Sequence, residues 1–325
     1  MNLYDILDVC PDILIADAFI VTSNKIKNYK NPVCSISGGS DSDMLLDLIS
    51  KVDPEKKTKY VFFNTGLEYK ATIEHLDYLE QKYNIEIVRE KAIKPIPLSC
   101  KKYGVPFLSK HVSEMIYRLQ KHNFKWEDKP YEELIKEYPN CKSALEWWCN
   151  RKLRKDGKIG MLNIDRDKYL KEFMVKNPPD FPISSKCCTY AKKNVSKRFC
   201  KCVGADLEMI GIRKSEGGIR SVQYKNCFTP GDTCDDYRPI FWITNKVKKL
   251  YNDTYGVENS RCYTEYGLTR TGCVGCTFNS NFEDELDRLQ QFEPLLFTAV
   301  NNIFGKSYEY TRKYREFKAT YKPDK

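Results

Sequence analysis

The stretch 37–42, Ser-Gly-Gly-Ser-Asp-Ser, decides the fold of this chain because of the segments on either side of it. The apolar run 32–36 before it predicts a buried strand, and residues 44–49 after it predict a helix. Two glycines let the backbone approach a ligand closely, and the free N–H groups at the start of a helix favour an anion. The pattern therefore predicts a phosphate-binding turn, the alternative being a glycine turn in an ordinary strand–helix unit.

This turn differs from the Gly-x-x-x-x-Gly-Lys-Ser/Thr loop, which does not occur in the sequence. It resembles instead the pyrophosphate-binding loop of the PP-loop ATP pyrophosphatases, whose relatives include the sulfonucleotide (APS and PAPS) reductases. Asp41 would orient Mg²⁺ or a ribose there and is the first candidate catalytic residue. The expected nucleotide-binding residues of this segment are Ser35, Ser37, Gly38, Gly39, Ser40, Asp41 and Ser42.

Composition predicts a globular protein with reduced thiols. The 325 residues are 41% hydrophobic and 30% charged, which suits a full core. The chain lacks an apolar run near the roughly 20 residues of a membrane helix, and its acidic N-terminus is unlike a secretory signal, so we expect a cytoplasmic location. The 14 cysteines then indicate free thiols and metal ligands rather than disulfides. The net charge of +10 is compatible with a nucleic acid or a polyanionic nucleotide.

Alternating apolar patterns predict an α/β fold, with a mainly parallel sheet flanked by helices. Strands are expected at 32–36, 59–64, 85–88, 206–212 and near 239–242, and helices within 3–30, at 70–83, near 247–251 and within 282–318. The proline-rich region 94–180 breaks this rhythm and predicts a helical insertion. The expected domains are a helical segment at 1–30, a nucleotide-binding domain at 31–255 with an insertion at about 95–180, and a CxxC-bearing helical region at 256–325.

Aromatic and histidine residues add little to the functional prediction. Trp147 and Trp148 suit buried core positions better than stacking on nucleic-acid bases. The chain has 3 histidines without a spacing pattern, and His75 is expected on an exposed helix face. We therefore assign the histidines no role.

Two pairs of cysteines predict a metal site. Cys273 and Cys276 enclose a tight turn, and two thiolates at this spacing bind one metal ion or two corners of a cluster. Cys187 and Cys188 are adjacent, which suits separate irons of one cluster better than a single tetrahedral ion. We expect an iron–sulfur cluster on these thiolates, with Zn²⁺ or inert buried thiols as alternatives. The rival ligands are Cys149, Cys227 and the pair Cys200 and Cys202.

Five segments in this order resemble the APS and PAPS reductases over most of the chain. They are FFNTGLEY at 62–69, KCCTYAKK at 186–193, GIRKSE at 211–216 with Arg220, PIFW at 239–242, and TGCVGC at 271–276. The resemblance implies a PP-loop fold of the adenine nucleotide alpha hydrolase type and a [4Fe–4S] cluster on Cys187, Cys188, Cys273 and Cys276. It assigns nucleotide contacts to Thr65, Gly66, Glu68 and Arg213. Arg213 and Arg220 would neutralise the charge of the leaving pyrophosphate and are the other candidate catalytic residues.

Two departures from the reductases favour ATP chemistry. The reductases carry their nucleophile in a C-terminal Glu-Cys-Gly-x-His, whereas this sequence has neither cysteine nor histidine after Cys276. The phosphate loop is also the full SGGxDS of the ATP pyrophosphatases. In both respects the chain resembles DndC-like proteins of DNA phosphorothioation and the iron–sulfur enzymes that thiolate tRNA.

Three functions follow as hypotheses. The first is an enzyme that uses ATP and Mg²⁺ to activate an acceptor with release of pyrophosphate for sulfur transfer. A nucleic acid is one candidate acceptor, a sulfur donor protein or a thiol reductant is a candidate partner, and a homo-oligomer is left open. The second is an APS/PAPS-reductase-like enzyme whose nucleophilic thiol comes from another cysteine or a partner. The third is a non-catalytic module that binds a nucleotide or a nucleic acid.

Overall fold

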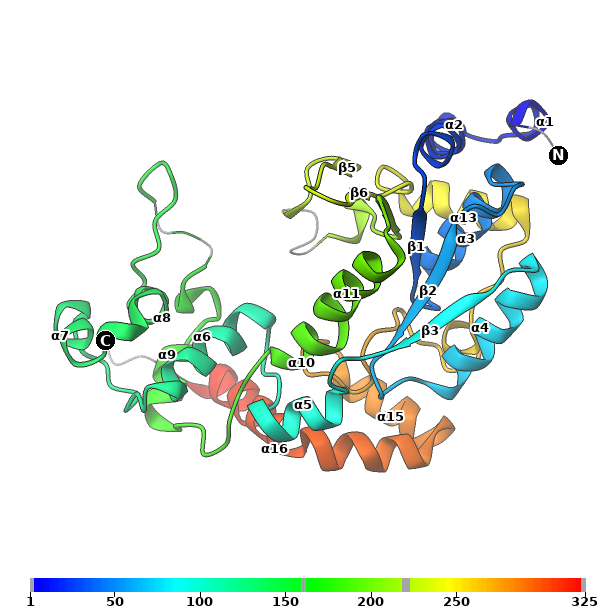
Figure 1. Ribbon diagram of the computed structural model, residues 1–325. Helices are drawn as coiled ribbons and strands as arrows, with labels where there is room; N and C mark the ends of the chain where they lie inside the picture. Colours follow the sequence, from blue (N-terminus) through cyan, green and yellow to red (C-terminus); the bar gives the residue numbers. More distant parts are fainter. Residues whose placement is uncertain (1–2, 159, 161, 218–222, 323–325) are drawn as a thin grey trace. The chain divides into compact units, whose positions relative to one another are not determined.

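The computed structural model describes residues 3–158, 160, 162–217 and 223–322 and contains two compact units. The first unit comprises Met1–Ile93 and Ala191–Val274, and the second comprises Lys94–Tyr190 and Gly275–Lys325. The unit boundary near the C-terminus therefore falls between Cys273 and Cys276. Figure 1 shows the elements of both units along the chain.

A six-stranded sheet forms the centre of the first unit, in the order β3-β2-β1-β4-β6-β5. Neighbouring strands pair in parallel except for β5, which pairs with β6 in the antiparallel direction. This mainly parallel sheet confirms the predicted fold class. The strands are β1 (Pro32–Ile36), β2 (Lys59–Asn64), β3 (Ile87–Lys91), β4 (Leu207–Ile210), β5 (Phe228–Thr229) and β6 (Asp235–Tyr237).

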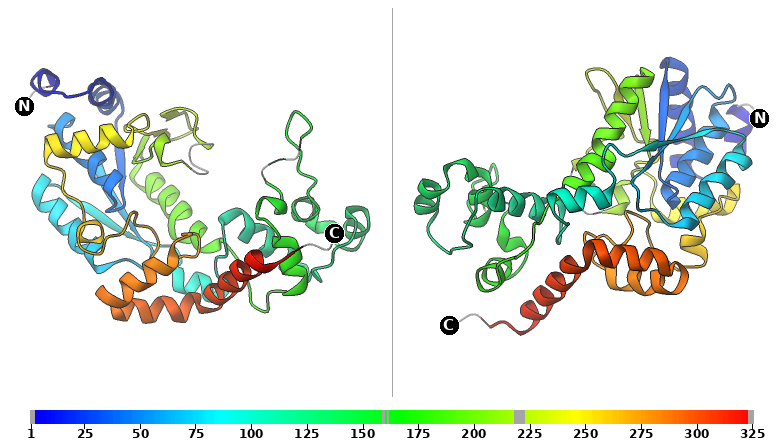
Figure 2. Two further views of the ribbon diagram at one scale, coloured as in Figure 1. Left: turned by 180° about the vertical axis from the view of Figure 1, so that it is seen from behind. Right: turned by 60° about the horizontal axis from the view of Figure 1, so that its bottom comes forward.

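Side chains alternate along the strands between two buried faces, as a doubly covered parallel sheet requires. Cys34 and Ile36 of β1 point to one face of the sheet, where they belong to the larger hydrophobic core of this unit together with several of its helices. Val33 and Val61 point to the other face and pack with Phe199 of α11 (Asn194–Val203). Figures 1 and 2 show α11 on one side of the sheet and α3 (Ser40–Val52) and α13 (Asn245–Tyr255) on the other. The helices of the larger core are α1 (Leu3–Asp8), α2 (Ile13–Asn28), α3 (Ser40–Val52), α4 (Lys70–Tyr83) and α13 (Asn245–Tyr255), and the short α14 (Arg261–Thr264) packs against α4.

The second unit is helical and has an aromatic core of its own. Trp147 and Trp148 are fully buried in it, and the Trp148 indole N–H donates to the Glu127 carbonyl at 3.0 Å. Both tryptophans are therefore core residues, as expected. Its helices are α5 (Ile96–Tyr103), α6 (Lys110–Lys121), α7 (Tyr131–Glu137), α8 (Lys142–Trp148), α9 (Leu170–Lys176), α10 (Lys186–Cys188), α15 (Phe282–Phe292) and α16 (Pro294–Thr320).

Several element boundaries differ from the expected ones for local reasons. The helical segment 3–30 is two helices, because Asp12 caps a new start by accepting the Leu14 N–H at 2.8 Å. The expected strand end at 239–242 is a turn, in which the Phe241 N–H donates to the Arg238 carbonyl at 3.1 Å. The short strands β6 and β5, of which β5 forms the sheet edge, were not predicted, and the expected strand 85–88 is shifted to Ile87–Lys91. Within the described part of the chain, every helix is too short or too polar to cross a bilayer.

Candidate nucleotide site and thiol group

The loop 37–42 lies where β1 ends and α3 begins, as predicted. Its strand has β2 on one side and β4 on the other, and this switch in strand order is where open α/β sheets bind ligands. Gly38 has a φ of +63°, and a Cβ there would lie 2.8 Å from Cγ2 of Thr72. Both the backbone conformation and the close approach of α4 therefore require glycine at this position.

Ser42 holds the loop together from inside. Its buried hydroxyl donates to the Gly39 carbonyl at 2.9 Å and accepts the N–H groups of Gly39 and Ser37 at 3.2 and 3.3 Å. The hydroxyl is thus occupied by the loop's own backbone. Ser42 therefore shapes the anion site, and its predicted contact with the nucleotide would act through the backbone that it positions.

Asp41 forms the electrostatic centre of the site. Its Oδ1 lies 2.8 Å from Nε of Arg213 and 2.5 Å from Nζ of Lys248. Arg213 is only 6% exposed, and its Nη1 also donates to Ser215 Oγ and Asn245 Oδ1 at 2.7 and 2.9 Å. The structure therefore brings together the predicted Asp41 and Arg213 as a fixed ion pair.

Lys248 was not predicted from the sequence. It is one of the lysines at the start of α13, at 246, 248 and 249, and nothing in that run distinguishes the inward one. Its side chain is 15% exposed, whereas that of Lys249 is 78% exposed and pairs with Asp253. Only the packing of α13 on α3 reveals that Lys248 faces the loop.

A tyrosine hydroxyl also reaches the loop. The Tyr263 oxygen, from α14, accepts the Ser40 N–H at 3.2 Å and the Thr271 N–H at 3.2 Å, and it lies 3.0 Å from Thr271 Oγ1. A Cβ on Gly39 would lie 3.0 Å from the same Thr271 oxygen. Tyr263 and Thr271 were not predicted as site residues, since they are far along the chain from the loop that they contact; Ser40 and Tyr263 are 223 residues apart.

The second predicted loop is arranged around Glu68. Its Oε1 accepts the Thr65 N–H at 2.9 Å and the Thr65 hydroxyl at 2.6 Å, and Gly66 has a φ of +80°. Burial raises the pKa of Glu68, while the Thr65 hydrogen bonds and the charge of Lys192 act in the opposite direction. Glu68 thus shapes this loop as Ser42 shapes the first.

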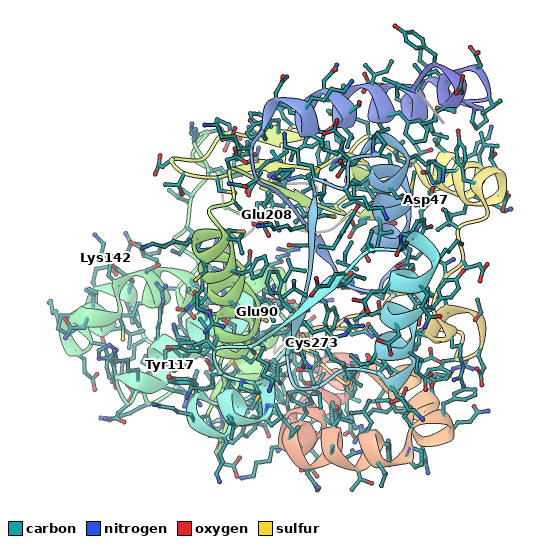
Figure 3. All side chains as sticks on the ribbon, turned by 45° about the vertical axis from the view of Figure 1, so that its right-hand side comes forward. Asp47, Glu90, Tyr117, Lys142, Glu208 and Cys273 are labelled. Carbon is teal, nitrogen blue, oxygen red and sulfur yellow. The ribbon has the colours of Figure 1, made fainter. Side chains whose placement is uncertain are left out.

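Two other predicted nucleotide contacts have different surroundings. The Ser35 hydroxyl donates to Glu208 Oε1 at 2.8 Å, and Ser196 of α11 donates to the same oxygen at 2.9 Å; Glu208 is labelled in Figure 3. Ser35 therefore lies within β1 on the α11 face rather than in the loop. Arg220 falls outside the described residues, so its predicted role stays a prediction.

A buried acid–histidine pair lies directly behind the loop. The Asp43 Oδ2 is 3.0 Å from His75 Nε2, and both side chains are buried. The expected exposed position of His75 was wrong, because the pairing with Asp43 brings the ring into the α3–α4 interface. Burial raises the pKa of Asp43, and the hydrogen bond and charge of His75 oppose that shift.

The predicted thiols of the second unit gather around Cys187. This buried thiol contacts Cys188 and also Cys100 of α5, and the contact with Cys100 is the main reason why the pKa of Cys187 is raised strongly. Cys276 lies close enough to raise that pKa as well. Helices α5 and α10 pack together, which brings Cys100 to Cys187 although the two are far apart in the sequence. Cys100 was not predicted, because it belongs to neither cysteine pair.

The other candidate ligands lie apart from this group or in the first unit. Cys149 packs against the aromatic core of the second unit, and Cys227 packs against the larger core of the first. Cys273 is half-buried and belongs to the first unit. Among the described residues, no group of three or more His, Cys, Asp or Glu side chains is arranged to hold a metal ion.

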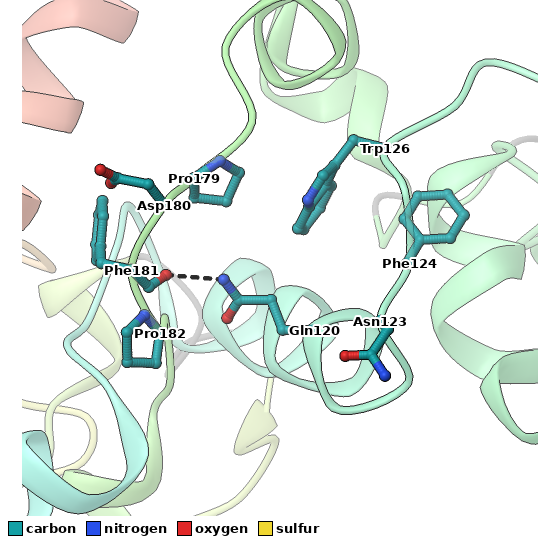
Figure 4. Close-up of a pocket in the computed structure, with 8 residues that line it drawn as sticks. All are labelled: Gln120, Asn123, Phe124, Trp126, Pro179, Asp180, Phe181 and Pro182. Carbon is teal, nitrogen blue, oxygen red and sulfur yellow. Dashed lines mark hydrogen bonds between the residues drawn. The ribbon is translucent and has the colours of Figure 1, made fainter.

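A surface cavity of the second unit contains none of the predicted residues. It has a volume of about 380 Å³ and is shown in Figure 4. The Gln120 amide lines it, donating to the Phe181 carbonyl at 2.8 Å and accepting the Ile183 N–H at 2.8 Å. Asp180 is the one acid or base among the described residues of its lining, so the cavity offers little chemistry.

Comparison with known proteins identifies one domain family. Residues 31–149 match the phosphoadenosine phosphosulfate reductase domain, which confirms the resemblance to that family. The matched segment includes the loop 37–42, the second loop at 65–68 and Cys100. No curated protein sequence matches the chain.

Three solved structures are similar at low sequence identity. A phosphoadenylyl-sulfate (PAPS) reductase from Candida auris, in a phosphate complex, is 12% identical with a TM-score of 0.45, over 83% of this chain and 93% of that one. The U34-tRNA thiolase NcsA from Methanococcus maripaludis, with its [4Fe-4S] cluster, is 14% identical with a TM-score of 0.37, over 94% and 82%. An NH3-dependent NAD synthetase from Campylobacter jejuni, in complex with nitrate, is 14% identical with a TM-score of 0.34, over the full length of both chains.

Proposed function

We propose that this protein is an ATP pyrophosphatase-type enzyme that transfers sulfur. Its residues 31–149 match the phosphoadenosine phosphosulfate reductase domain. The observation that carries the proposal is the SGGSDS loop at the carboxyl end of β1, with Asp41 held between Arg213 and Lys248. Such a loop presents backbone N–H groups and a helix N-terminus to an anion, and two cations stand beside it.

The proposed reaction transfers an adenylyl group. A nucleophilic oxygen of the acceptor attacks the α-phosphorus of ATP, the bond to the bridging oxygen breaks, and pyrophosphate leaves with the electron pair. The loop N–H groups bind the leaving pyrophosphate, while Arg213 and Lys248 stabilise the negative charge that develops on it. Asp41 is the residue that would hold Mg²⁺, which supplies further positive charge to the phosphates when bound.

Sulfur transfer is assigned to the thiol group. We place a [4Fe–4S] cluster, with Zn²⁺ as the alternative, on Cys187, Cys188, Cys273 and Cys276. The donor type fits, since thiolates are the usual ligands of such clusters, and Cys187 contacts Cys188 and lies near Cys276. When bound, the cluster would supply an electrophilic iron for sulfur. Among the described residues, these side chains do not themselves form a coordinating arrangement.

Pyrophosphate release by the protein purified without oxygen tests this proposal. Asp41→Asn should lower release from ATP by at least about 100-fold, because the variant loses the charge that holds Mg²⁺ and positions both cations. Asp253→Asn, which changes an exposed carboxylate on α13, is the matched control and should retain full activity. Wild-type turnover in Asp41→Asn would refute the assignment of the loop.

A sulfonucleotide reductase is the second candidate, and the identity of the matched domain favours it. In that reaction APS or PAPS would yield sulfite with a thiol donor, the nucleophilic thiol coming from another cysteine or a partner. Assays of sulfite release run beside the pyrophosphate assay distinguish the two. Sulfite without pyrophosphate would replace the first proposal by the second.

A further inference from the structure

The hydrogen bonds of the Tyr263 hydroxyl connect the loop 37–42 with the segment that carries the CxxC. Tyr263 lies on α14, Ser40 opens α3, and Thr271 lies two residues before Cys273. The Ser40 and Thr271 N–H groups each lie 3.2 Å from the Tyr263 oxygen. All of these residues belong to the first unit.

The hydroxyl has no bonding capacity left. A tyrosine hydroxyl can accept two hydrogen bonds and donate one. The Tyr263 oxygen accepts the two N–H groups, so its proton is directed to Thr271 Oγ1 at 3.0 Å. A new acceptor for the Ser40 N–H can therefore bind only if the Tyr263 hydroxyl gives up that bond.

The Ser40 N–H is the kind of group that an anion at this loop uses. It is among the first N–H groups of α3, which lack partners within the helix. The Tyr263 oxygen thus takes the place of one oxygen of a bound anion. Gly39 is equally close, since a Cβ there would lie 3.3 Å from the Tyr263 hydroxyl.

Gly272, directly after Thr271, has open space where a side chain would begin. A Cβ on Gly272 would meet no atom within 4 Å, and Cys273 is half-buried. By contrast, the start of α14 is fixed, because the Ser260 hydroxyl donates to the Ala71 carbonyl and caps the Cys262 N–H at 3.2 Å. Loss of the Tyr263 bonds would therefore loosen Thr271 rather than the start of α14.

We propose that Tyr263 is a positioning residue that couples anion binding at loop 37–42 to the position of Thr271, two residues before Cys273. An anion that takes the Ser40 N–H displaces the Tyr263 hydroxyl, and Thr271 is released with it. In the absence of an anion the same hydroxyl keeps Thr271 against the loop. The coupling rests on the proposed function for the identity of the anion, pyrophosphate or the phosphates of a nucleotide.

Calorimetry and amide hydrogen exchange with inorganic pyrophosphate as the probe test this coupling. In the wild type, pyrophosphate should speed exchange in the peptide containing Thr271 by about fivefold, the value of one lost hydrogen bond. In Tyr263→Phe that exchange should already be fast and should not respond to pyrophosphate. The same variant should bind pyrophosphate about fivefold more tightly, since nothing competes for the Ser40 N–H.

Two further variants keep the test decisive. Tyr310→Phe removes another tyrosine hydroxyl, which donates to the Asn177 carbonyl within the second unit, and should behave as the wild type at the loop. Thr271→Val retains the Ser40 bond while removing the Thr271 Oγ1 contact. Thr271→Val should speed amide hydrogen exchange in the peptide containing residue 271 and leave pyrophosphate affinity within about twofold of the wild type.

The outcomes separate this inference from the proposed function. Pyrophosphate that binds without changing exchange at Thr271, or a Tyr263→Phe variant with the wild-type response, overturns the coupling. If neither pyrophosphate nor ATP binds the wild type, the proposed function fails. The ligand-free exchange of Tyr263→Phe then still decides whether Tyr263 holds Thr271, because unchanged exchange overturns that contact and faster exchange supports it.

Discussion

The phosphate loop and the thiol group differ in how completely they are formed. In the loop, polar side chains have defined partners: Ser42 bonds the backbone, Asp41 pairs with two cations, and the Tyr263 hydroxyl is saturated. In the thiol group Cys187 contacts Cys100 and Cys188, yet the described residues lack a metal-holding arrangement. The loop is organised by its own hydrogen bonds, whereas thiols repel as thiolates and assemble fully only around a metal.

The largest effect is expected from removing the central thiol. Cys187→Ala should abolish iron and sulfide binding after anaerobic reconstitution, because Cys187 contacts Cys100 and Cys188 and lies near Cys276. Metal analysis and the visible absorption spectrum measure the loss. Cys141→Ala removes another buried thiol of the same unit, with its Sγ near the Arg118 carbonyl, and should retain the wild-type iron content. Full iron content in Cys187→Ala would show that the group is not the metal site.

The next effect concerns the shape of the loop. Gly38→Ala should lower the free energy of unfolding by about 2 kcal/mol, because alanine is strained at a left-handed φ and its Cβ would overlap Thr72. Urea denaturation measures the change. Gly157→Ala, at a φ of +76° with open space around its Cβ, isolates the backbone contribution and should cost less. Equal losses in the two variants would mean that the contact with Thr72 is unimportant.

These two regions also show what sequence could predict. The strand, loop and helix of the phosphate site could be predicted from residues 32–49, because the hydrophobic periodicity and the glycines that indicate them lie within this short segment. Lys248 and Tyr263 reach the same loop from distant helices, and only the packing of α13 and α14 selects them. Cys100 joins the thiols for the same reason, through the packing of α5 on α10. His75 was misplaced because its partner, Asp43, follows the loop on another helix.

A smaller effect should distinguish the two lysines of α13. Lys248→Met should weaken ATP binding by about tenfold, since it removes a charge-assisted contact from the loop. Lys249→Met changes the neighbouring exposed lysine, whose ion pair with Asp253 contributes little, and should bind ATP as the wild type does. Calorimetry at constant ionic strength measures both affinities. Equal weakening in the two variants would indicate a general charge effect rather than a contact at the site.

The smallest effect tests the buried pair behind the loop through its pH dependence. Because burial raises the pKa of Asp43 in the folded chain, folding favours its protonated form. The preference for protonated Asp43 therefore stabilises the folded chain fully below the unfolded pKa of about 3.9. This stabilisation is lost as the pH rises through the pKa of Asp43 in the folded chain. The amide introduced by Asp43→Asn cannot titrate, so the free energy of unfolding of the wild type relative to this variant should fall as the pH rises above about 4. Urea denaturation across that range measures the difference. A difference that rises with pH would mean that the charged Asp43 is stabilised by His75 more than burial penalises it, and the pair would then act as a fixed ion pair beneath the phosphate loop.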